Sequence, residues 1–319
     1  MRALITGITG QDGAYLAKFL LNKGYAVFGM ARRSSTDSQA RLRALGIEDA
    51  ITLLSGDMTD AGSLIAAVCE SKPDEVYNLA AQSFVKESFA TPVATFEVNA
   101  MGAVSLMGAV MTHAPNARYY QASTSEMFGL VNVDSQDEST PFHPRSPYGV
   151  AKCAAHHATV NYREAYGLHA SCGILFNHES PLRGNEFVTK KVADGVKGIL
   201  AGTQNELMLG NLDASRDWGH AKDYVKAMWL MLQQDNPDDY VIATGETHSV
   251  REFVACAFES AGLKYQDYVR LDKRFLRPSD VPLLCGNPEK AKRVLGWERT
   301  YTFHGLIDEM VLGRLRAVA

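Results

Sequence analysis

Residues 3–13 read ALITGITGQDG, a short apolar run that leads into glycines with the spacing G-x-x-G-x-x-G. The run predicts a buried β-strand, and the residues after Gly13 have the periodicity of an amphipathic helix. Glycines at such a junction let the backbone approach a pyrophosphate, whose charge is stabilised by the amide groups of the helix N-terminus. Because a glycine triplet alone also occurs in ordinary turns, the strand before it and the helix after it are needed for a dinucleotide-site interpretation.

The same alternation of strand and helix continues through the first half of the chain. Amphipathic stretches separate short runs that are apolar or β-branched, as strands buried on both faces should be. The predicted strands are Ala3–Ile5, Tyr25–Met30, Ile51–Leu54, Glu75–Leu79, Arg118–Ala122 and Ser171–Phe176. This order predicts an α/β fold with a doubly wound parallel Rossmann sheet.

The second half has fewer strand signals and more proline and glycine, which indicates a smaller C-terminal α/β substrate-binding domain. We expect the Rossmann domain to comprise residues 1–176 and about 217–246, and the second domain about 177–216 and 247–319. The predicted elements here are the helices Phe187–Leu200, Asp223–Gln233, Val250–Ala261, Pro288–Leu295 and Phe303–Arg314, and the strand Tyr240–Ala243.

Composition excludes several classes of protein. The 319 residues are 46% hydrophobic and 21% charged, which is ordinary for a globular chain. A net charge of −4 disfavours nucleic acid and anionic membranes as partners. Five scattered cysteines without zinc-like spacing indicate reduced thiols and a cytoplasmic location. We expect neither a signal peptide nor an apolar run near the ~18 residues of a membrane span.

The end of the second predicted strand indicates which nicotinamide cofactor binds. An NAD site usually has an acid there, but this chain has Arg32 and Arg33, whose guanidinium groups suit the 2′-phosphate of NADP. A solvated basic loop is the alternative interpretation. We expect the strand ends to complete the site. The candidate cofactor residues are Gly7, Thr9, Gly10, Gln11, Asp12, Gly13, Arg32, Arg33, Asp57, Met58, Leu79, Ala80, Ala81 and Ser83.

Residues 146–152 (SPYGVAK) predict the start of a helix with a catalytic pair on it. Ser146 is a suitable N-cap and Pro147 suits the first turn. Tyr148 and Lys152 are four residues apart and therefore share one helix face. An ammonium group beside a tyrosine, with a cationic nicotinamide nearby, favours the phenolate and makes it a base. Most Y-x-x-x-K pairs are surface pairs, so the interpretation depends on the residues upstream.

The fifth predicted strand ends in Thr124 and Glu126, two residues apart. If this segment is extended, both side chains point to the same side. Thr124 can hydrogen-bond a substrate hydroxyl, and Glu126 is a candidate acid or base. A solvated glutamate at a strand end is the alternative.

Together the glycine motif, Thr124 and the Tyr148/Lys152 pair resemble the extended short-chain dehydrogenase/reductase family. Four longer blocks resemble its GDP-mannose 4,6-dehydratase branch, and the resemblance covers essentially the whole chain. The blocks are Ala122–Gly129 (ASTSEMFG), Pro141–Lys152 (PFHPRSPYGVAK), Ile174–Arg183 (ILFNHESPLR) and Leu209–Asp223 (LGNLDASRDWGHAKD).

The resemblance implies a lyase that works by internal redox chemistry with bound NADP. Tyr148, assisted by Lys152 and Thr124, would deprotonate the sugar 4-hydroxyl while hydride passes from C4 to NADP⁺. Glu126 would then remove the acidified C5 proton, water would leave from C6, and the hydride would return to C6. Related dehydratases acting on dTDP-glucose have an aspartate where this chain has Ser125, so Glu126 is expected to serve as both base and acid.

The resemblance also implies a GDP-sugar site in the second domain. His178 and Arg183 match residues near the cofactor. The candidate substrate residues are Ser83, Thr124, Glu126, Tyr148, Asn177, Val188, Lys191, Gly210, Arg216, Arg277 and Asp280. Asp280 stands where the pattern has a glutamate that could pair with guanine, so this contact is the least secure. A few placed cations are compatible with the net negative charge, because a diphosphate needs only local positive groups.

Other functions remain open on the sequence. The same dehydration on a GDP-manno-heptose needs the same catalytic residues. A GDP-4-keto-6-deoxy-hexose reductase or an epimerase needs no base at C5, so Glu126 argues against both. A non-catalytic NADP-binding regulator would have lost the catalytic set. We expect no metal, because the adjacent His156 and His157 point about 100° apart on a helix. The resemblance implies a homotetramer, or a dimer, with the loop Arg32–Gln39 at an interface.

Overall fold

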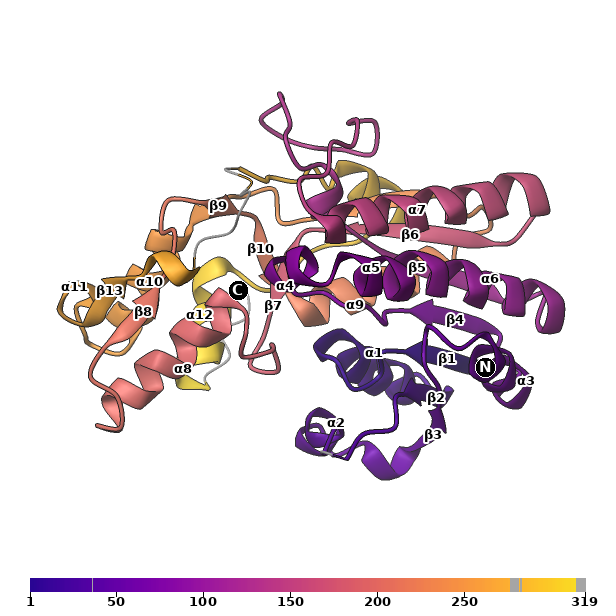
Figure 1. Cartoon of the computed structure of the whole chain (residues 1–319), viewed down its shortest axis with the longest axis horizontal. Coiled ribbons are helices and arrows are strands. Elements are labelled where there is room, and N and C mark those ends of the chain that lie inside the picture. The colour runs from indigo at the N-terminus through magenta and orange to yellow at the C-terminus, as the bar shows by residue number, and fades with distance from the viewer. Residues whose placement is uncertain (36, 276–280, 282, 314–319) are drawn as a thin grey trace.

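A seven-stranded parallel sheet forms the centre of the molecule in the computed structural model (Figure 1). The structure describes every residue except 36, 276–280, 282 and 314–319. The strand order is β11-β6-β5-β4-β1-β2-β3, so the chain reverses direction across the sheet beside β1. The strands are β1 (Arg2–Thr6), β2 (Ala26–Ala31), β3 (Ile51–Ser55), β4 (Glu75–Asn78), β5 (Arg118–Thr124), β6 (Ala170–Leu175) and β11 (Asp239–Ile242). The predicted doubly wound Rossmann sheet is therefore confirmed.

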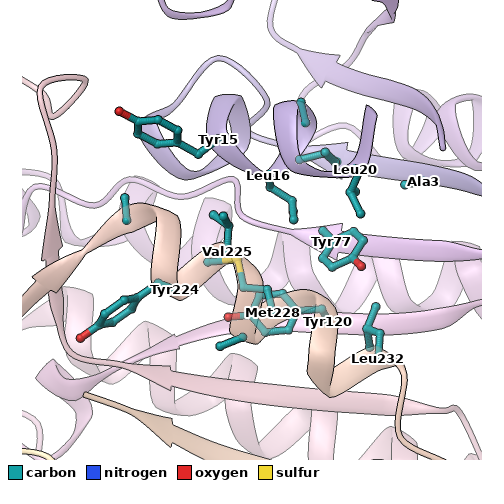
Figure 2. Packing of buried hydrophobic residues seen from close by; sticks show 14 of the residues in the cluster. Ala3, Tyr15, Leu16, Leu20, Tyr77, Tyr120, Tyr224, Val225, Met228 and Leu232 are labelled. Atoms are coloured by element: carbon teal, nitrogen blue, oxygen red, sulfur yellow. The ribbon is translucent and has the colours of Figure 1, made fainter. Parts of the chain in front are cut away.

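Helices cover both faces of this sheet, as parallel crossover connections require. On one face, α1 (Gln11–Asn22) packs against α9 (Ala221–Leu232), with Leu16, Leu20, Met228 and Leu232 fully buried (Figure 2). Figure 2 also shows Tyr77 of β4 and Tyr120 of β5 beneath the two helices. The other face carries α3 (Ala61–Ser71), α6 (Gly102–His113) and α7 (Pro147–Tyr166).

One helical segment on that second face is longer and more apolar than the sequence analysis expected. α5 (Pro92–Phe96), the π-helical turn η2 (Glu97–Met101) and α6 form a continuous 22-residue helix with a mean hydropathy of 1.4 over its most apolar window. By length and composition this helix could cross a membrane, so the expectation that no segment approaches that length is corrected. Half of the window is buried against the rest of the protein, and Leu106, Met107 and Val110 are fully buried. We interpret the segment as a core helix.

A second hydrophobic core lies beside the sheet, at the left of Figure 1. It brings together α8 (Val188–Leu200), α10 (Val250–Ser260) and α12 (Phe303–Leu312) around Trp218. The remaining strands are β7 (Asn177–Glu179), β8 (Leu207–Leu209), β9 (Ser215–Arg216), β10 (Trp218–His220), β12 (His248–Ser249) and β13 (Val269–Leu271). The remaining helices are α2 (Ala40–Ala44), α4 (Val85–Ala90), α11 (Tyr265–Tyr268) and the short turns η1 (Glu48–Ala50), η3 (Ser125–Met127), η4 (Lys273–Phe275) and η5 (Ala291–Leu295).

One segment near the C-terminus belongs to the core of the sheet, although its neighbours along the chain belong to the second core. Ala291, Leu295 and Trp297 belong to the core under α1 and α9, although they lie in the chain between α10 and α12 of the second core. Trp297 donates its indole N–H to the Asp223 carbonyl at 2.8 Å, which ties this segment to the start of α9. The C-terminal third of the chain therefore contributes to both cores.

Candidate active site

A cleft of about 580 Å³ runs along the carboxyl ends of β1 to β6, the edge where parallel sheets bind ligands. It collects residues from both halves of the chain. Most predicted cofactor residues line it: Gly7, Thr9, Gly10, Gln11, Asp12, Gly13, Arg32, Asp57, Met58, Leu79, Ala80, Ala81, Ser83, His178 and Arg183. The four predicted catalytic residues and Asn177 line the same cleft: Thr124, Glu126, Tyr148 and Lys152.

The glycine loop has the shape that a dinucleotide pyrophosphate requires. Gly7 has a φ of +70°, and a Cβ atom there would lie 2.8 Å from the backbone nitrogen of Ala80. A Cβ atom on Gly13 would lie 2.4 Å from the Gly7 carbonyl oxygen, so α1 packs directly on the loop. No side chain caps the N-terminus of α1 at Gly10, which leaves its first amides facing the cleft as an anion site. These residues fit a dinucleotide cofactor.

The two arginines after β2 differ in position. Arg32 lines the cleft directly after the strand, beside Asp57 at the end of β3. Hydrogen bonds from Thr59 lower the pKa of Asp57, and the charge of Arg32 adds to this effect. Arg33 is exposed and is absent from the cleft lining within the described part of the chain. One of the two predicted 2′-phosphate ligands thus lies in the cleft.

The start of α7 places the tyrosine and the lysine as predicted. The Ser146 hydroxyl caps the helix by accepting a hydrogen bond from the Gly149 amide at 3.1 Å. Tyr148 and Lys152 then face the cleft, and both are buried. The Lys152 Nζ donates to the Ala122 carbonyl at 2.8 Å and lies 6.0 Å from the centre of the Tyr148 ring.

The protein groups around Tyr148 do not by themselves favour the phenolate, which was expected with a cationic nicotinamide nearby. Burial raises the pKa of Tyr148 to about 12, against a lowering by the Thr124 hydrogen bond and with a further rise from Glu126. Burial also lowers the pKa of Lys152 to about 8. The Lys152 Nζ is turned to the Ala122 carbonyl.

Thr124 and Glu126 reach the cleft by a different backbone from the one expected. β5 ends at Thr124, and η3 turns directly after it, so the two residues are not part of one extended strand. The Thr124 hydroxyl caps this turn by accepting the Glu126 amide at 3.3 Å. The turn carries the Glu126 side chain back into the cleft, where its charge acts on Tyr148.

Two of the predicted substrate cations, Lys191 and Arg216, lie beyond the cleft, towards the second core. Val188, Lys191, Gly210 and Arg216 are absent from the cleft lining within the described ranges. The Lys191 Nζ lies 3.3 Å from the centre of the Phe275 ring, and a Cβ atom on Gly210 would lie 2.8 Å from the Phe275 carbonyl oxygen. Arg216 is buried and donates to the Val281 carbonyl at 2.7 Å. Arg277 and Asp280 lie outside the described residues.

Several residues of this region carry no pattern by which the sequence could reveal them. Phe187 lines the cleft, and Lys86 of α4 donates to the Arg274 carbonyl at 2.6 Å. Burial lowers the pKa of Lys191, and the charge of Lys86 lowers it further, so the two cations are neighbours. Lys86 and Lys191 belong to opposite halves of the chain, and only the fold brings them together.

One cluster has donor atoms that a metal ion could use. The side chains of His156, Cys172 and Asp239 offer atoms within 4.8 Å of one another, which the sequence analysis overlooked because they come from α7, β6 and β11. Arg163 binds both carboxylate oxygens of Asp239 at 2.9 Å, and the His156 Nδ1 is 3.1 Å from the Ser123 hydroxyl. Because the guanidinium already neutralises the carboxylate, we interpret the cluster as structural.

The whole chain is similar to a known protein family and to proteins of solved structure. A family model described as GDP-mannose 4,6 dehydratase matches residues 4–310. GDP-mannose 4,6 dehydratase 1 of Arabidopsis thaliana is 54% identical over 97% of this chain and 88% of its own length. The human GDP-mannose 4,6 dehydratase is 49% identical over 97% of this chain and 90% of its own length. Among solved structures, a UDP-glucose 4-epimerase complex with NAD from Thermus thermophilus superposes with a TM-score of 0.85 at 27% identity, covering 98% of each chain.

Proposed function

The chain belongs to the GDP-mannose 4,6-dehydratase family, and from this premise we propose that it converts GDP-mannose to GDP-4-dehydro-6-deoxy-D-mannose and water. Such an enzyme is a hydro-lyase that oxidises and then reduces the same sugar. The observation that supports this function best is the convergence of Thr124, Glu126, Tyr148 and Lys152 on one cleft beside the glycine loop.

The cofactor belongs to the nicotinamide dinucleotides, which are bound in structural relatives of this chain. We propose NADP, since Arg32 lines the cleft where an NAD site usually has an acid. The residues that would hold it are the glycine loop, the N-terminus of α1, Arg32 and the ends of β3 and β4. When bound, it supplies a hydride acceptor at C4 and a hydride donor at C6.

The first proton transfer falls to Tyr148. The Thr124 hydroxyl hydrogen-bonds the Tyr148 phenol, and the two groups together define where the sugar 4-hydroxyl would bind. The oxidation of C4 removes a hydroxyl proton, and Tyr148 is the base positioned to take it. Lys152 would support the phenolate from the same helix face through the charge of its ammonium group, once its Nζ turns from the Ala122 carbonyl.

Glu126 supplies the step that separates a dehydratase from a simple reductase. A 4-keto group acidifies the neighbouring C5 hydrogen, so that a carboxylate can remove it. The C6 hydroxyl then needs a proton in order to leave as water, and the carboxylic acid that has just formed can supply that proton. Ser125 is a much weaker acid than a carboxyl group, so we assign both transfers to Glu126. The product also gains a proton at C5 when the hydride returns to C6, and the protonated Tyr148 or solvent can supply it.

An end-product assay tests this function. Purified enzyme with GDP-mannose and NADP⁺ is expected to yield a 4-keto-6-deoxy sugar nucleotide, identified by NMR, without net accumulation of NADPH. NADPH released in step with substrate would show a plain dehydrogenase and overturn the dehydratase assignment. The same assay across a panel of GDP-sugars, GDP-manno-heptose included, separates the hexose substrate from the heptose.

Assembly, location and domain limits are also proposals. We propose a homotetramer, or a dimer, in which the loop Arg32–Gln39 reaches a neighbouring subunit, and light scattering with and without NADP⁺ tests it.

We propose a cytoplasmic location, in keeping with five cysteines that are all free. We also propose that residues 1–176 and about 217–246 bind the cofactor, and that about 177–216 and 247–319 bind the nucleotide sugar.

A further inference from the structure

Asp12 and His178 form a contact that joins the first turn of α1 to β7 inside the cleft. The Asp12 Oδ2 lies 2.8 Å from the His178 Nε2, and the two residues are 166 positions apart in the chain. The side chains are 23% and 11% exposed, and both line the cleft. A carboxylate at this place is unexpected, because the first turn of α1 is where a dinucleotide pyrophosphate binds and two anions repel one another.

The hydrogen bonds of His178 fix its protonation state. Its Nδ1 lies 2.7 Å from the Phe176 carbonyl oxygen, and its Nε2 lies against the Asp12 carboxylate. A carbonyl oxygen can only accept a hydrogen bond, and so can an ionised carboxylate. Both ring nitrogens must therefore donate, which makes the ring an imidazolium cation.

The neighbouring charges support an ion pair over a neutral pair. Burial lowers the pKa of His178, but the charge and hydrogen bond of Asp12 outweigh it and the pKa is raised. Burial raises the pKa of Asp12, but His178 and then Arg183 outweigh it and the pKa is lowered. The N-terminus of α1 also favours a carboxylate at Asp12.

The other groups that surround His178 among the described residues are either paired or uncharged. Arg183 is paired with Glu179, whose Oε2 lies 3.0 Å from the Arg183 Nε. From α9, Tyr224 stacks on the imidazole at 4.4 Å between ring centres, and burial raises its pKa so far that it stays neutral. The strand paired with His178 presents Gly219, which has no side chain. His178 is therefore the main neutralising group for Asp12, with a smaller contribution from the charge of Arg183.

We infer that His178 is a positioning and charge-compensating residue: held as an imidazolium by Asp12 and Phe176, it cancels the carboxylate in the first turn of α1 and so lets the cleft accept the cofactor diphosphate. This inference rests on the proposed function for the presence of a dinucleotide. It also explains how a helix N-terminus with an acidic first turn can serve an anion. The same contact ties β7, from which Arg183 follows, to the glycine loop.

The charge of His178 can be measured without any cofactor. Histidine ring ¹⁵N and ¹³Cε1 NMR spectra of the full chain, with the His178 signal identified by its loss in His178→Asn, report the protonation state directly. The expected result is an imidazolium signal for His178 at pH 7.5. A neutral imidazole at pH 7.5 would overturn the inference, whether or not the chain is a dehydratase.

A double-mutant cycle tests the compensation itself. Calorimetric NADP⁺ affinities are compared for the wild type, His178→Asn, Asp12→Asn and the double variant, with circular dichroism as the check on folding. We expect His178→Asn to weaken binding about tenfold or more, and the double variant to recover most of that loss, because no carboxylate is then left to cancel. His178→Gln is the second variant if His178→Asn does not fold.

The NMR measurement and the double-mutant cycle distinguish a failure of this inference from a failure of the proposed cofactor. A double variant as weak as His178→Asn would show that His178 acts without compensating Asp12, and would overturn the inference. A wild-type chain that binds no NADP⁺ would refute the proposed cofactor, while the NMR arm would still decide the charge of His178. Added salt should reduce the loss in His178→Asn, because a charge effect is screened.

Discussion

The replacement Gly13→Ala tests the link between the packing of α1 and cofactor binding. An added Cβ atom would lie 2.4 Å from the Gly7 carbonyl oxygen and 2.6 Å from the Ile8 Cα. Ordinary contacts begin near 3.4 Å, and both obstructing atoms are backbone, so no side chain can rotate away. The N-terminus of α1 must therefore move about 1 Å from the loop to admit the methyl group.

The size of the effect follows from that displacement. Overpacking of this kind costs about 1–3 kcal/mol. An unfolding entropy of about 2.1 cal/mol/K per residue corresponds to roughly 0.7 kcal/mol/K for this chain, so Tm should fall by about 1–4 °C. The anion site moves with α1, and a 1 Å misplacement is enough to lower NADP⁺ affinity by about tenfold or more.

Thermal unfolding followed by circular dichroism, together with calorimetric titration of NADP⁺, measures both effects. Gly108→Ala in α6 is the matched control, because its Cβ atom would meet only the Tyr162 hydroxyl, at 3.8 Å. That control should gain about 0.4–1 kcal/mol, since alanine suits a helix better than glycine, and should bind NADP⁺ normally. A Gly13→Ala protein with wild-type Tm and wild-type affinity would refute the packing argument.

Three further predictions concern other parts of the site. Glu126→Gln should abolish dehydration and the exchange of the C5 hydrogen with solvent, both followed by NMR in D₂O; unchanged turnover would remove Glu126 from the mechanism. Arg32→Ala should weaken NADP⁺ binding about tenfold or more while NAD⁺ changes little, and Arg33→Ala, which alters an exposed side chain, should have the smaller effect; equal losses for both cofactors would contradict a 2′-phosphate role. Burial lowers the pKa of His156 to about 4, so the unfolded chain takes up a proton that the folded chain does not, and stability should fall by up to about 3 kcal/mol as pH falls from about 6.5 to about 4. Denaturant unfolding across this pH range should show a flatter profile for His156→Asn than for the wild type, and parallel profiles would exclude His156 as the cause.

Local patterns were sufficient for the elements of the fold. The apolar run before Gly7 became β1, and the serine and proline before Tyr148 began α7 as expected. These signals are short-range, because burial on both faces selects apolar strands and a cap needs only a nearby hydroxyl. The sequence did not predict the full length of the apolar helix Pro92–His113, because Glu97 and Asn99 interrupt its apolar residues without ending the helix.

The sequence predicted which residues would line the cleft, but it did not predict which atoms their side chains would contact. The expected extended segment from Thr124 to Glu126 is a turn, because the strand ends where the Thr124 hydroxyl accepts the Glu126 amide. The sequence predicted the Lys152 ammonium group beside Tyr148, but in the structure its Nζ donates a hydrogen bond to the Ala122 carbonyl. A helical spacing tells which residues share a face, but the atoms that each side chain contacts depend on the neighbouring strands.

The sequence by itself predicted the strands and helices of the Rossmann sheet, the glycine loop and the candidate catalytic residues, because periodicity, helix caps and motifs are readable over short stretches of chain. Only the tertiary structure decided the electrostatics of the cleft. The charge of Asp12 depends on a histidine 166 positions away, and the pKa of Tyr148 depends on burial by several elements at once. Electrostatic interactions act through space and strengthen where water is excluded, so they become defined only when distant parts of the chain enclose the site.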